Sequence, residues 1–304
     1  MTQLLNALPG ALAQGLIWGV MAIGVYITYK VLDIADLTVD GSICTGAAVC
    51  TMLLLGGQSP WLALLCAVLA GVLAGAVTGL LHVGLGIPPI LAGILTQMEL
   101  WSVNLKLLGK ANQALPARTT PVLLSQMDVG GALPVLLGFC VVLVALLVLF
   151  FGTELGCALR ATGCNPVMSR AQGVNTGLMK IIGLALSNGV VALSGALLCQ
   201  YQGYTDVNMG RGAVVIGLAA VVIGQAVLGR RGGRMAVQLG GVILGAVIYY
   251  IVYQVIIFAG FDTDLLKMFS AVVVAVFLGA PHVKAQLKAH SHSKKGDSGH
   301  AENE

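Results

Sequence analysis

Residues 41–98 contain no Asp, Glu, Lys or Arg, and His82 is their only titratable side chain apart from cysteines. A membrane-spanning helix needs about 20 consecutive apolar residues, so a run of this length has room for more than one span. Across all 304 residues only 9% are charged, whereas soluble globular proteins carry about 25%. The sequence therefore excludes a soluble enzyme, a nucleic-acid-binding protein and a disordered protein, and it predicts an integral membrane protein.

The spans are predicted to be helices. Strands of a membrane barrel alternate apolar and polar residues, but VVLVALLVLFF (141–151) is apolar on every side. We expect an all-α polytopic helix bundle with about nine membrane segments, followed by a disordered tail over residues 284–304 that leaves 1–283 as the transmembrane domain. The segments cover approximately residues 10–29, 37–55, 60–84, 87–108, 132–152, 179–201, 212–228, 236–259 and 265–283.

Two of these segments, 37–55 and 87–108, contain polar residues that interrupt the apolar pattern. Non-helical backbone at membrane depth is tolerated only where protein or a water-filled path surrounds it. We therefore consider each of the two a candidate for a broken or re-entrant helix. The first apolar run lacks the basic region of a cleavable signal peptide, so we expect it to be retained as a span.

Basic residues predict the orientation, because they collect in cytoplasmic loops. One side would carry Lys30, the loop 153–178, the short loop 229–234 and the tail, with eleven basic residues when Lys180 is included. The other side would carry five, among them Arg211. This count places the first set in the cytoplasm, with the N-terminus outside and the C-terminus inside.

Small residues recur four positions apart, which lets helices approach closely. They are Gly15 and Gly19, Gly71, Gly75 and Gly79, and Gly241 and Gly245. A faint internal repeat is also visible, since DLTVDGSICTGAAV (36–49) aligns with DVNMGRGAVVIGLAAV (206–221). The predicted topology runs the two segments in opposite directions, as in the inverted repeats of transporters. Chance similarity between two Gly/Ala-rich segments is the alternative.

The loop ELGCALRATGCNPVMSRAQGVNTG (154–177) is the longest polar interruption on the basic side. Asn165 is a good helix N-cap, and Pro166 suits the first helical position. Gly173 suits the residue that ends a helix. The spacing predicts a short cytoplasmic helix, and such a capped helix is typical of a surface that docks a soluble partner.

This loop resembles the coupling loop of permease subunits of ABC importers of the branched-chain amino-acid and ribose type. The segment DLTVDGSICTGAAV and LHVGLGIPPILAGILT (81–96) are also similar to that family, and the resemblance covers about residues 12–280. It implies that coupling to the ATPase is carried by Arg160, Gly163, Asn165, Pro166, Arg170, Gly173 and Asn175.

The resemblance also implies a complex in the bacterial cytoplasmic membrane. It would contain two permease chains, which we expect to be identical and surrounded by lipid. It would also contain two cytoplasmic ATPase subunits and an extracytoplasmic solute-binding protein, with no nucleic acid. The chain has no G-x-x-x-x-G-K-[ST] motif to hold ATP phosphates. We therefore expect ATP and Mg²⁺ on the partner ATPase, and neither a cofactor nor catalysis on this chain. The implied substrate is an amino acid or a related small organic solute.

Polar residues within spans are candidates for the translocation path. We name Gln97, Glu99, Asn104, Asn188 and Gln225, with hydrogen bonding between helices as the alternative role. No metal-binding pattern is predicted, and we interpret the histidines of the tail as part of a solvated segment. Two other functions stay open, an ion-gradient-coupled secondary transporter and a membrane-embedded enzyme, although the sequence shows neither a carboxylate relay nor a His/Asp/Glu cluster for them.

Overall fold

A computed structural model of the chain describes residues 2–116, 120–228, 234–258 and 275, with side chains from residue 7 onward. Most of the described residues are helical. The helices are α1 (Thr2–Tyr26), the π-helical turn η1 (Ile27–Val31), α2 (Val39–Leu55), α3 (Pro60–Gly84), α4 (Pro89–Leu108), α5 (Val129–Gly152), α6 (Glu154–Cys164), α7 (Pro166–Ala171), α8 (Thr176–Gln202), α9 (Ala213–Leu228) and α10 (Met235–Phe258), and two short strands are β1 (Asn112–Ala114) and β2 (Tyr204–Asp206).

The first eight predicted membrane segments each overlap one helix, and the ninth, apart from residue 275, lies outside the described residues. Five helical stretches are long and apolar enough to cross a membrane, namely α1 continued through η1, α3, α5, α8 and α10. The helices α2 and α9 are apolar but have only 17 and 16 residues. The structure therefore confirms an all-α membrane bundle, while the count of nine segments remains a prediction.

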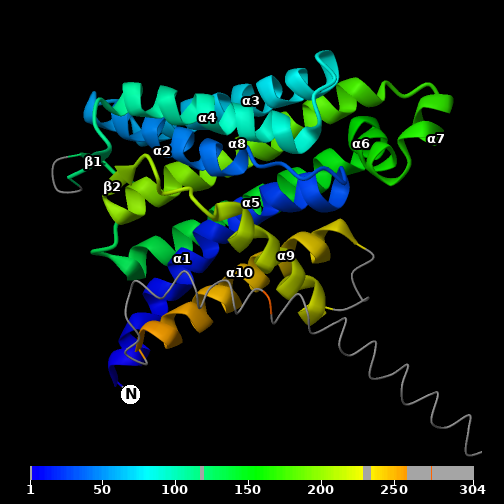
Figure 1. Cartoon of the computed structure of the whole chain (residues 1–304). Helices are drawn as coiled ribbons and strands as arrows, with labels where there is room; N and C mark the ends of the chain where they lie inside the picture. The colour runs from blue at the N-terminus through cyan, green and yellow to red at the C-terminus, as the bar shows by residue number, and fades with distance from the viewer. Residues whose placement is uncertain (1, 117–119, 229–233, 259–274, 276–304) are drawn as a thin grey trace, which may run out of the picture.

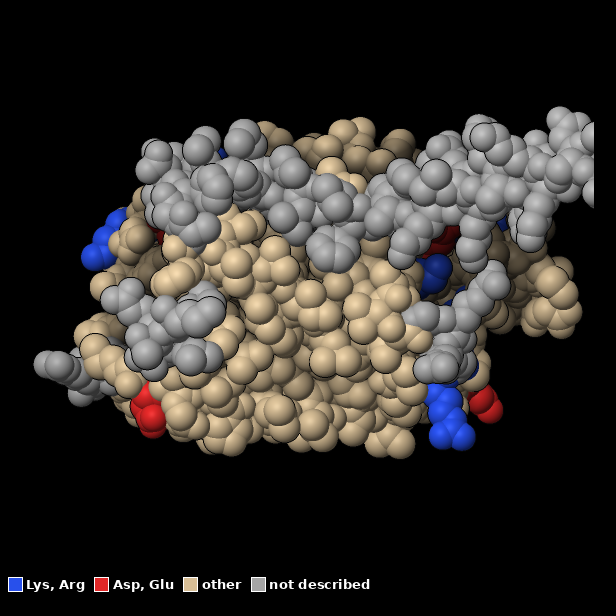
Figure 2. Space-filling model, turned by 90° about the horizontal axis from the view of Figure 1, so that it is seen from below, with Lys and Arg blue, Asp and Glu red and all other residues tan. Residues whose placement is uncertain are grey.

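The helix α8 lies at the centre of the bundle, where it packs against α1, α2 and α3 (Figure 1). Its most apolar stretch is 72% buried, whereas the corresponding stretch of α5 is 28% buried. On the face shown in Figure 2, the described charged side chains lie toward the two ends of the molecule, and other residues cover the surface between them. This distribution is the one that a lipid bilayer requires of a spanning protein.

The predicted glycine faces pack helices together within the chain. A side chain on Gly75 of α3 would overlap the carbonyl oxygen of Leu184 in α8, so only glycine permits this approach. The same close packing is made by Gly71 and Gly79 against α8, by Gly15 and Gly19 against α10, and by Gly241 and Gly245 against α9. The packing role expected from their spacing is confirmed.

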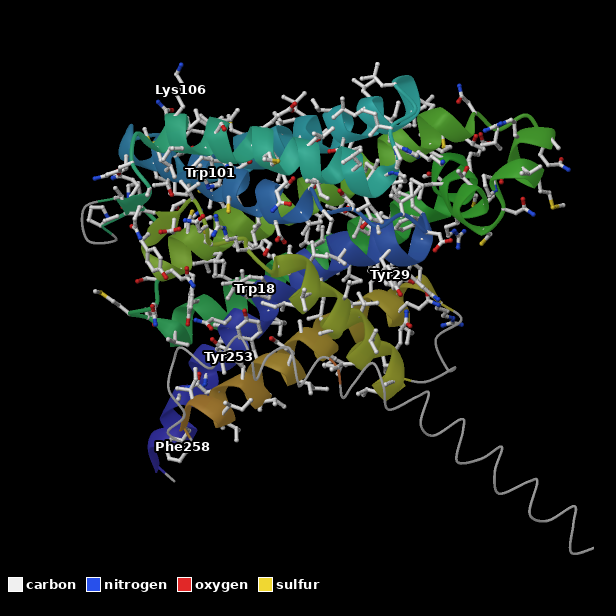
Figure 3. The ribbon with its side chains drawn as sticks, viewed as in Figure 1. Trp18, Tyr29, Trp101, Lys106, Tyr253 and Phe258 are labelled. Atoms are coloured by element: carbon white, nitrogen blue, oxygen red, sulfur yellow. The ribbon has the colours of Figure 1, made fainter. Side chains whose placement is uncertain are left out.

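The two ends of the bundle differ. At one end β1 pairs antiparallel with β2, with Asn112 opposite Asp206. At the other end α6 lies beside η1, which contains Lys30, and α7 packs on α6 (Figure 1). Tyr29 and Lys106 mark these opposite ends in Figure 3. Lys30 and the loop 153–178 therefore share one end, as the charge count expects, and which end faces the cytoplasm remains a prediction.

The helix α2 is a half-helix that begins inside the bundle. After η1 the chain turns back through an extended segment, and Asp36 there is 5% exposed. The amide of Thr38 donates to Asp36 Oδ1 at 2.9 Å, just before α2 begins. A polar sequence at the start of this segment is thus explained by a chain reversal in the protein interior. The helix α4, the other candidate for a break, runs uninterrupted.

Candidate functional site

The half-helices α2 and α9 meet at their N-termini. Asp40, in the first turn of α2, accepts hydrogen bonds from the amides of Gly212 and Val214, each at 3.0 Å. These are among the amides at the start of α9 that have no partner within the helix. A carboxylate is also the group that the positive end of a helix dipole favours. From this junction α2 and α9 run toward opposite ends of the bundle (Figure 1).

The junction lies at mid-depth in the bundle. Asn188, about halfway along α8, accepts a hydrogen bond from Ser42 Oγ at 2.6 Å and donates to Asp36 Oδ2 at 2.8 Å. Asn188 is fully buried, and its amide thus ties both sides of the chain reversal to α8. Because Ser42 follows Asp40 by two residues, Asp40 and the start of α9 lie at the same depth.

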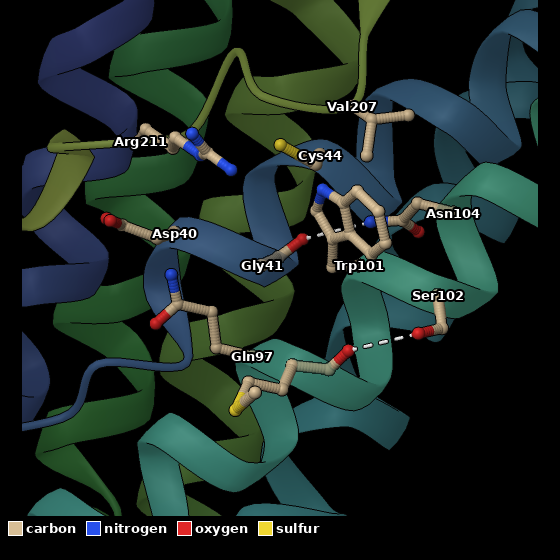
Figure 4. A pocket seen from close by; sticks show the side chains of 10 residues that line it. Asp40, Gly41, Cys44, Gln97, Trp101, Ser102, Asn104, Val207 and Arg211 are labelled. Carbon is tan, nitrogen blue, oxygen red and sulfur yellow. Dashed lines mark hydrogen bonds between the residues drawn. The ribbon is translucent and has the colours of Figure 1, made fainter. Parts of the chain in front are cut away.

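A cavity of about 470 Å³ opens beside this junction (Figure 4). Its walls come from α2, from α4 and from the turn before α9. They consist of Asp40, Gly41, Cys44, Gln97, Met98, Trp101, Ser102, Asn104, Val207 and Arg211. The basic-residue count assigned Arg211 to an outer loop, but the structure places it in the turn just before α9, with its guanidinium group pointing toward the cavity.

The wall formed by α4 carries polar groups with few partners. Asn104 is 1% exposed, and its Nδ2 donates weakly to the carbonyl of Gly41 at 3.5 Å. Its Oδ1 is buried without a hydrogen-bond partner in the described part of the chain. Trp101 lies one helical turn before Asn104 and donates through Nε1 to Asn208 at 3.4 Å.

The five predicted path residues separate into three groups. Gln97 and Asn104 line the cavity. Asn188 is a buried structural residue behind it, which is the role that the sequence left as its alternative. Glu99 and Gln225 are exposed on α4 and α9 and do not line this cavity. The cavity residues that sequence reasoning did not select include Trp101 and Arg211, although the repeat alignment had paired the segment of Arg211 with that of Asp40.

At the far end of the bundle, α6 and α7 form a braced loop. Asn165 Oδ1 accepts from the amide of Met168 at 3.0 Å, Pro166 is the first residue of α7, and Gly173 follows the helix with a φ of +84°. The predicted caps and stop of the short helix are therefore confirmed. Asn175 caps α8 in the same way, by accepting from Leu178 at 3.1 Å.

The two arginines of the loop bind the helices that flank it, α5 and α8. Arg170 donates to Thr176 Oγ1 at 3.1 Å, and Arg160 donates to the carbonyl of Phe151 at 3.2 Å. Gly163 lies so close to the carbonyl of Val31 that no side chain fits between them. These residues hold α6 and α7 against the ends of α5, η1 and α8, so the loop is a rigid extension of the bundle.

A bundle of spanning helices in which two half-helices meet beside a cavity is typical of membrane transport proteins. The chain belongs to the family of permease components of branched-chain amino acid transport systems, whose pattern matches residues 8–280. It is thus the membrane permease of an ABC import system for a small solute. No solved structure matches the chain significantly.

Of three curated relatives, two are permeases by name. The tyrosine transport system permease protein of Clostridioides difficile is 38% identical over 287 residues, which cover 93% of this chain and 94% of the relative. An uncharacterized protein of Rickettsia prowazekii is 33% identical and covers 91% and 98%. The autoinducer 2 import system permease protein of Escherichia coli is 30% identical over 216 residues, which cover 67% of this chain and 60% of the relative.

Proposed function

We propose that the chain forms, together with a second permease chain, the membrane pathway of an ATP-driven importer of amino acids. The support for this substrate class is the relative that is 38% identical over nearly the whole length of both chains and is described as a tyrosine transport permease. The family description names branched-chain amino acids. The autoinducer 2 permease is less similar and covers less of the chain.

ATP hydrolysis on a partner subunit is coupled to this chain through the loop of α6 and α7. The observation that carries this assignment is the exposure of two large apolar side chains at its tip, with Val167 79% and Met168 62% exposed. Apolar side chains presented on a polar loop outside the membrane mark a protein contact. The brace of Arg170 on Thr176 keeps them in a fixed position, as a lever requires. A cytoplasmic ATPase subunit that binds ATP and Mg²⁺ is the partner proposed for this surface.

The proposed orientation places α6 and α7 in the cytoplasm and the β1–β2 end outside the bacterial cytoplasmic membrane. An extracytoplasmic binding protein would then deliver the solute to the β1–β2 end. The opposite directions of α2 and α9 support the inverted repeat inferred from their sequences. Apolar residues along one exposed face of α3 are proposed to contact lipid or the second permease chain, and they are Trp61, Leu65, Leu69, Leu73 and Leu80.

Reconstitution tests this function against the ion-gradient alternative. The permease is co-expressed with its candidate ATPase and binding protein, purified, and placed in proteoliposomes that contain ATP or no nucleotide. We expect amino-acid uptake that needs ATP and persists when ionophores collapse ion gradients. Uptake that continues without nucleotide and disappears with the ionophores would identify a secondary transporter instead.

A further inference from the structure

The cavity at the junction of α2 and α9 contains a cation without a matching anion. Among the described residues, no carboxylate lies within ion-pair distance of Arg211, and its guanidinium group makes no hydrogen bond. Arginine at membrane depth is costly, and it is retained where it serves a substrate path or finds a partner. The unpaired Arg211 therefore indicates that this cavity binds a negatively charged group that does not belong to the chain.

Asp40 lies on the same cavity wall but does not neutralise Arg211. Its two carboxylate oxygens are each bound by an amide of α9, at 3.0 Å from Gly212 and 3.0 Å from Val214. Its charge is thus directed to the N-terminus of α9. The guanidinium group of Arg211 keeps its planar set of donors, which matches a carboxylate in a two-point contact.

The opposite wall offers acceptors instead of charges. Gln97, Trp101 and Asn104 follow one another at spacings of four and three residues, so they lie on one face of α4. Gln97 has no hydrogen-bond partner among the described residues, and Asn104 has an unpartnered Oδ1. A buried acceptor without a donor is unfavourable. The indole ring of Trp101 between them provides an apolar surface (Figure 4).

We propose that this cavity binds the transported solute as a zwitterionic α-amino acid. Arg211 binds the carboxylate, the amide oxygens of Gln97 and Asn104 receive the ammonium group, and the solute side chain lies against Trp101. This inference rests on the proposed function, because it assigns the amino-acid class to residues of the permease itself. Under this inference the permease itself recognises the carboxylate and the ammonium group of the solute, in addition to any recognition by the binding protein.

Cysteine protection tests the site directly. Ser102 is an exposed residue of the cavity wall, so a Ser102→Cys variant is made in a chain whose Cys66, Cys157 and Cys164 are replaced by serine. The assembled complex is labelled with a water-soluble thiol reagent in the presence of L-tyrosine or L-leucine. We expect at least one amino acid to slow labelling, and its decarboxylated amine, tyramine or isopentylamine, to have no effect. Asn112→Cys on β1, exposed and outside the cavity, is the control that no solute should protect.

Three results would overturn the inference. They are failure of the reagent to reach Ser102→Cys, protection by the amines as strong as by the amino acids, and protection by D-ribose alone. Each of them leaves an ATP-dependent complex intact, so it is distinguishable from failure of the proposed function.

Substitution of Arg211 provides a second readout. In the reconstituted complex Arg211→Gln should lower amino-acid uptake at least about tenfold, because the carboxylate loses its charged partner in a confined site. Arg211→Lys keeps the charge but not the two-point geometry, so its amino-acid uptake should lie between that of the unchanged permease and that of Arg211→Gln. Recovery of both variants with the ATPase subunit reports correct folding. Normal uptake by Arg211→Gln in an assembled complex would contradict the assignment.

Discussion

Asp40 and Val214 are 174 residues apart in the sequence, yet the Asp40 carboxylate accepts the Val214 amide hydrogen at 3.0 Å. With the second bond from Gly212, this contact joins the starts of two half-helices in the middle of the bundle. The contact uses a side chain on one helix to satisfy the backbone of another, so its loss leaves two amides at the start of α9 without their acceptor.

Asp40→Ala should therefore destabilise the permease by about 1–3 kcal/mol, since two amides at the start of α9 lose their charged acceptor. Asp40→Asn retains one acceptor oxygen and should cost less. Thermal unfolding in detergent, followed by tryptophan fluorescence, measures both changes. Ser102→Ala, in the same cavity but without a role in the junction, is the matched control. Equal unfolding temperatures for Asp40→Ala and the control would show that the junction adds no stability.

Gly75→Leu should prevent normal folding, because the added atoms would occupy the space of the Leu184 carbonyl and force α3 away from α8. Overpacking costs about 1–3 kcal/mol even for single methylene groups, and here the obstacle is backbone. The measurements are membrane expression and a monodisperse peak in size-exclusion chromatography. Gly138→Leu in α5 is the control, since a side chain there meets open space. Normal expression of Gly75→Leu with an altered substrate preference would contradict a packing role.

Replacing both Val167 and Met168 with serine should weaken recovery of the ATPase with the permease, because the exposed apolar tip of α7 is removed. The unfolding temperature of the permease alone should stay within about 2 °C, as expected for exposed positions. Co-purification and ATP hydrolysis measure the effect. Val215→Ser on α9, exposed but remote from the loop, is the control.

Arg170→Glu should act by a different route, since Arg170 donates to Thr176 and so fixes the loop to α8. We expect intact membrane insertion, and loss of ATPase stimulation that is larger than the loss of binding. Gly173→Pro should behave similarly, because proline cannot adopt the positive φ of this position. If both variants support full amino-acid uptake, the loop is not the coupling element.

Accessibility labelling checks the proposed orientation. In a chain whose Cys66, Cys157 and Cys164 are replaced by serine, Gln172→Cys should react only from the cytoplasm and Asn112→Cys only from outside. Both positions are exposed, so an absence of reaction reports sidedness and not burial. The reverse pattern would invert the assignment made from basic residues.

The features that the sequence predicted best are helix positions, caps and stops, because these depend on residues that are neighbours in the chain. Uncharged runs located the helices, and the Asn165, Pro166 and Gly173 pattern located α7, because caps and stops are local. The sequence also indicated a break before α2 from the polar residues there. A break in α4 was considered for the same reason, but α4 is continuous, since Gln97 and Asn104 face a cavity and not a chain reversal.

The cavity itself was beyond local patterns. Its walls join residues 40, 101 and 211, and nothing in the sequence around Trp101 indicates that a half-helix starting at residue 213 will face it. Arg211 looked like a loop residue because the following segment was assumed to start at the membrane surface. Only the packing of α2 on α8, and of α9 on α1 and α10, reveals its depth.

The chain reversal before α2 also sets the order in which the protein can be completed during synthesis. A 17-residue segment is shorter than the roughly 20 residues that hold a helix in the bilayer by themselves. The partner of Asp36 is Asn188, which leaves the ribosome 152 residues later. Until then the early segments must wait in the membrane with a buried acid only half satisfied. We therefore expect the nascent permease to be most vulnerable to proteases before α8 has been inserted.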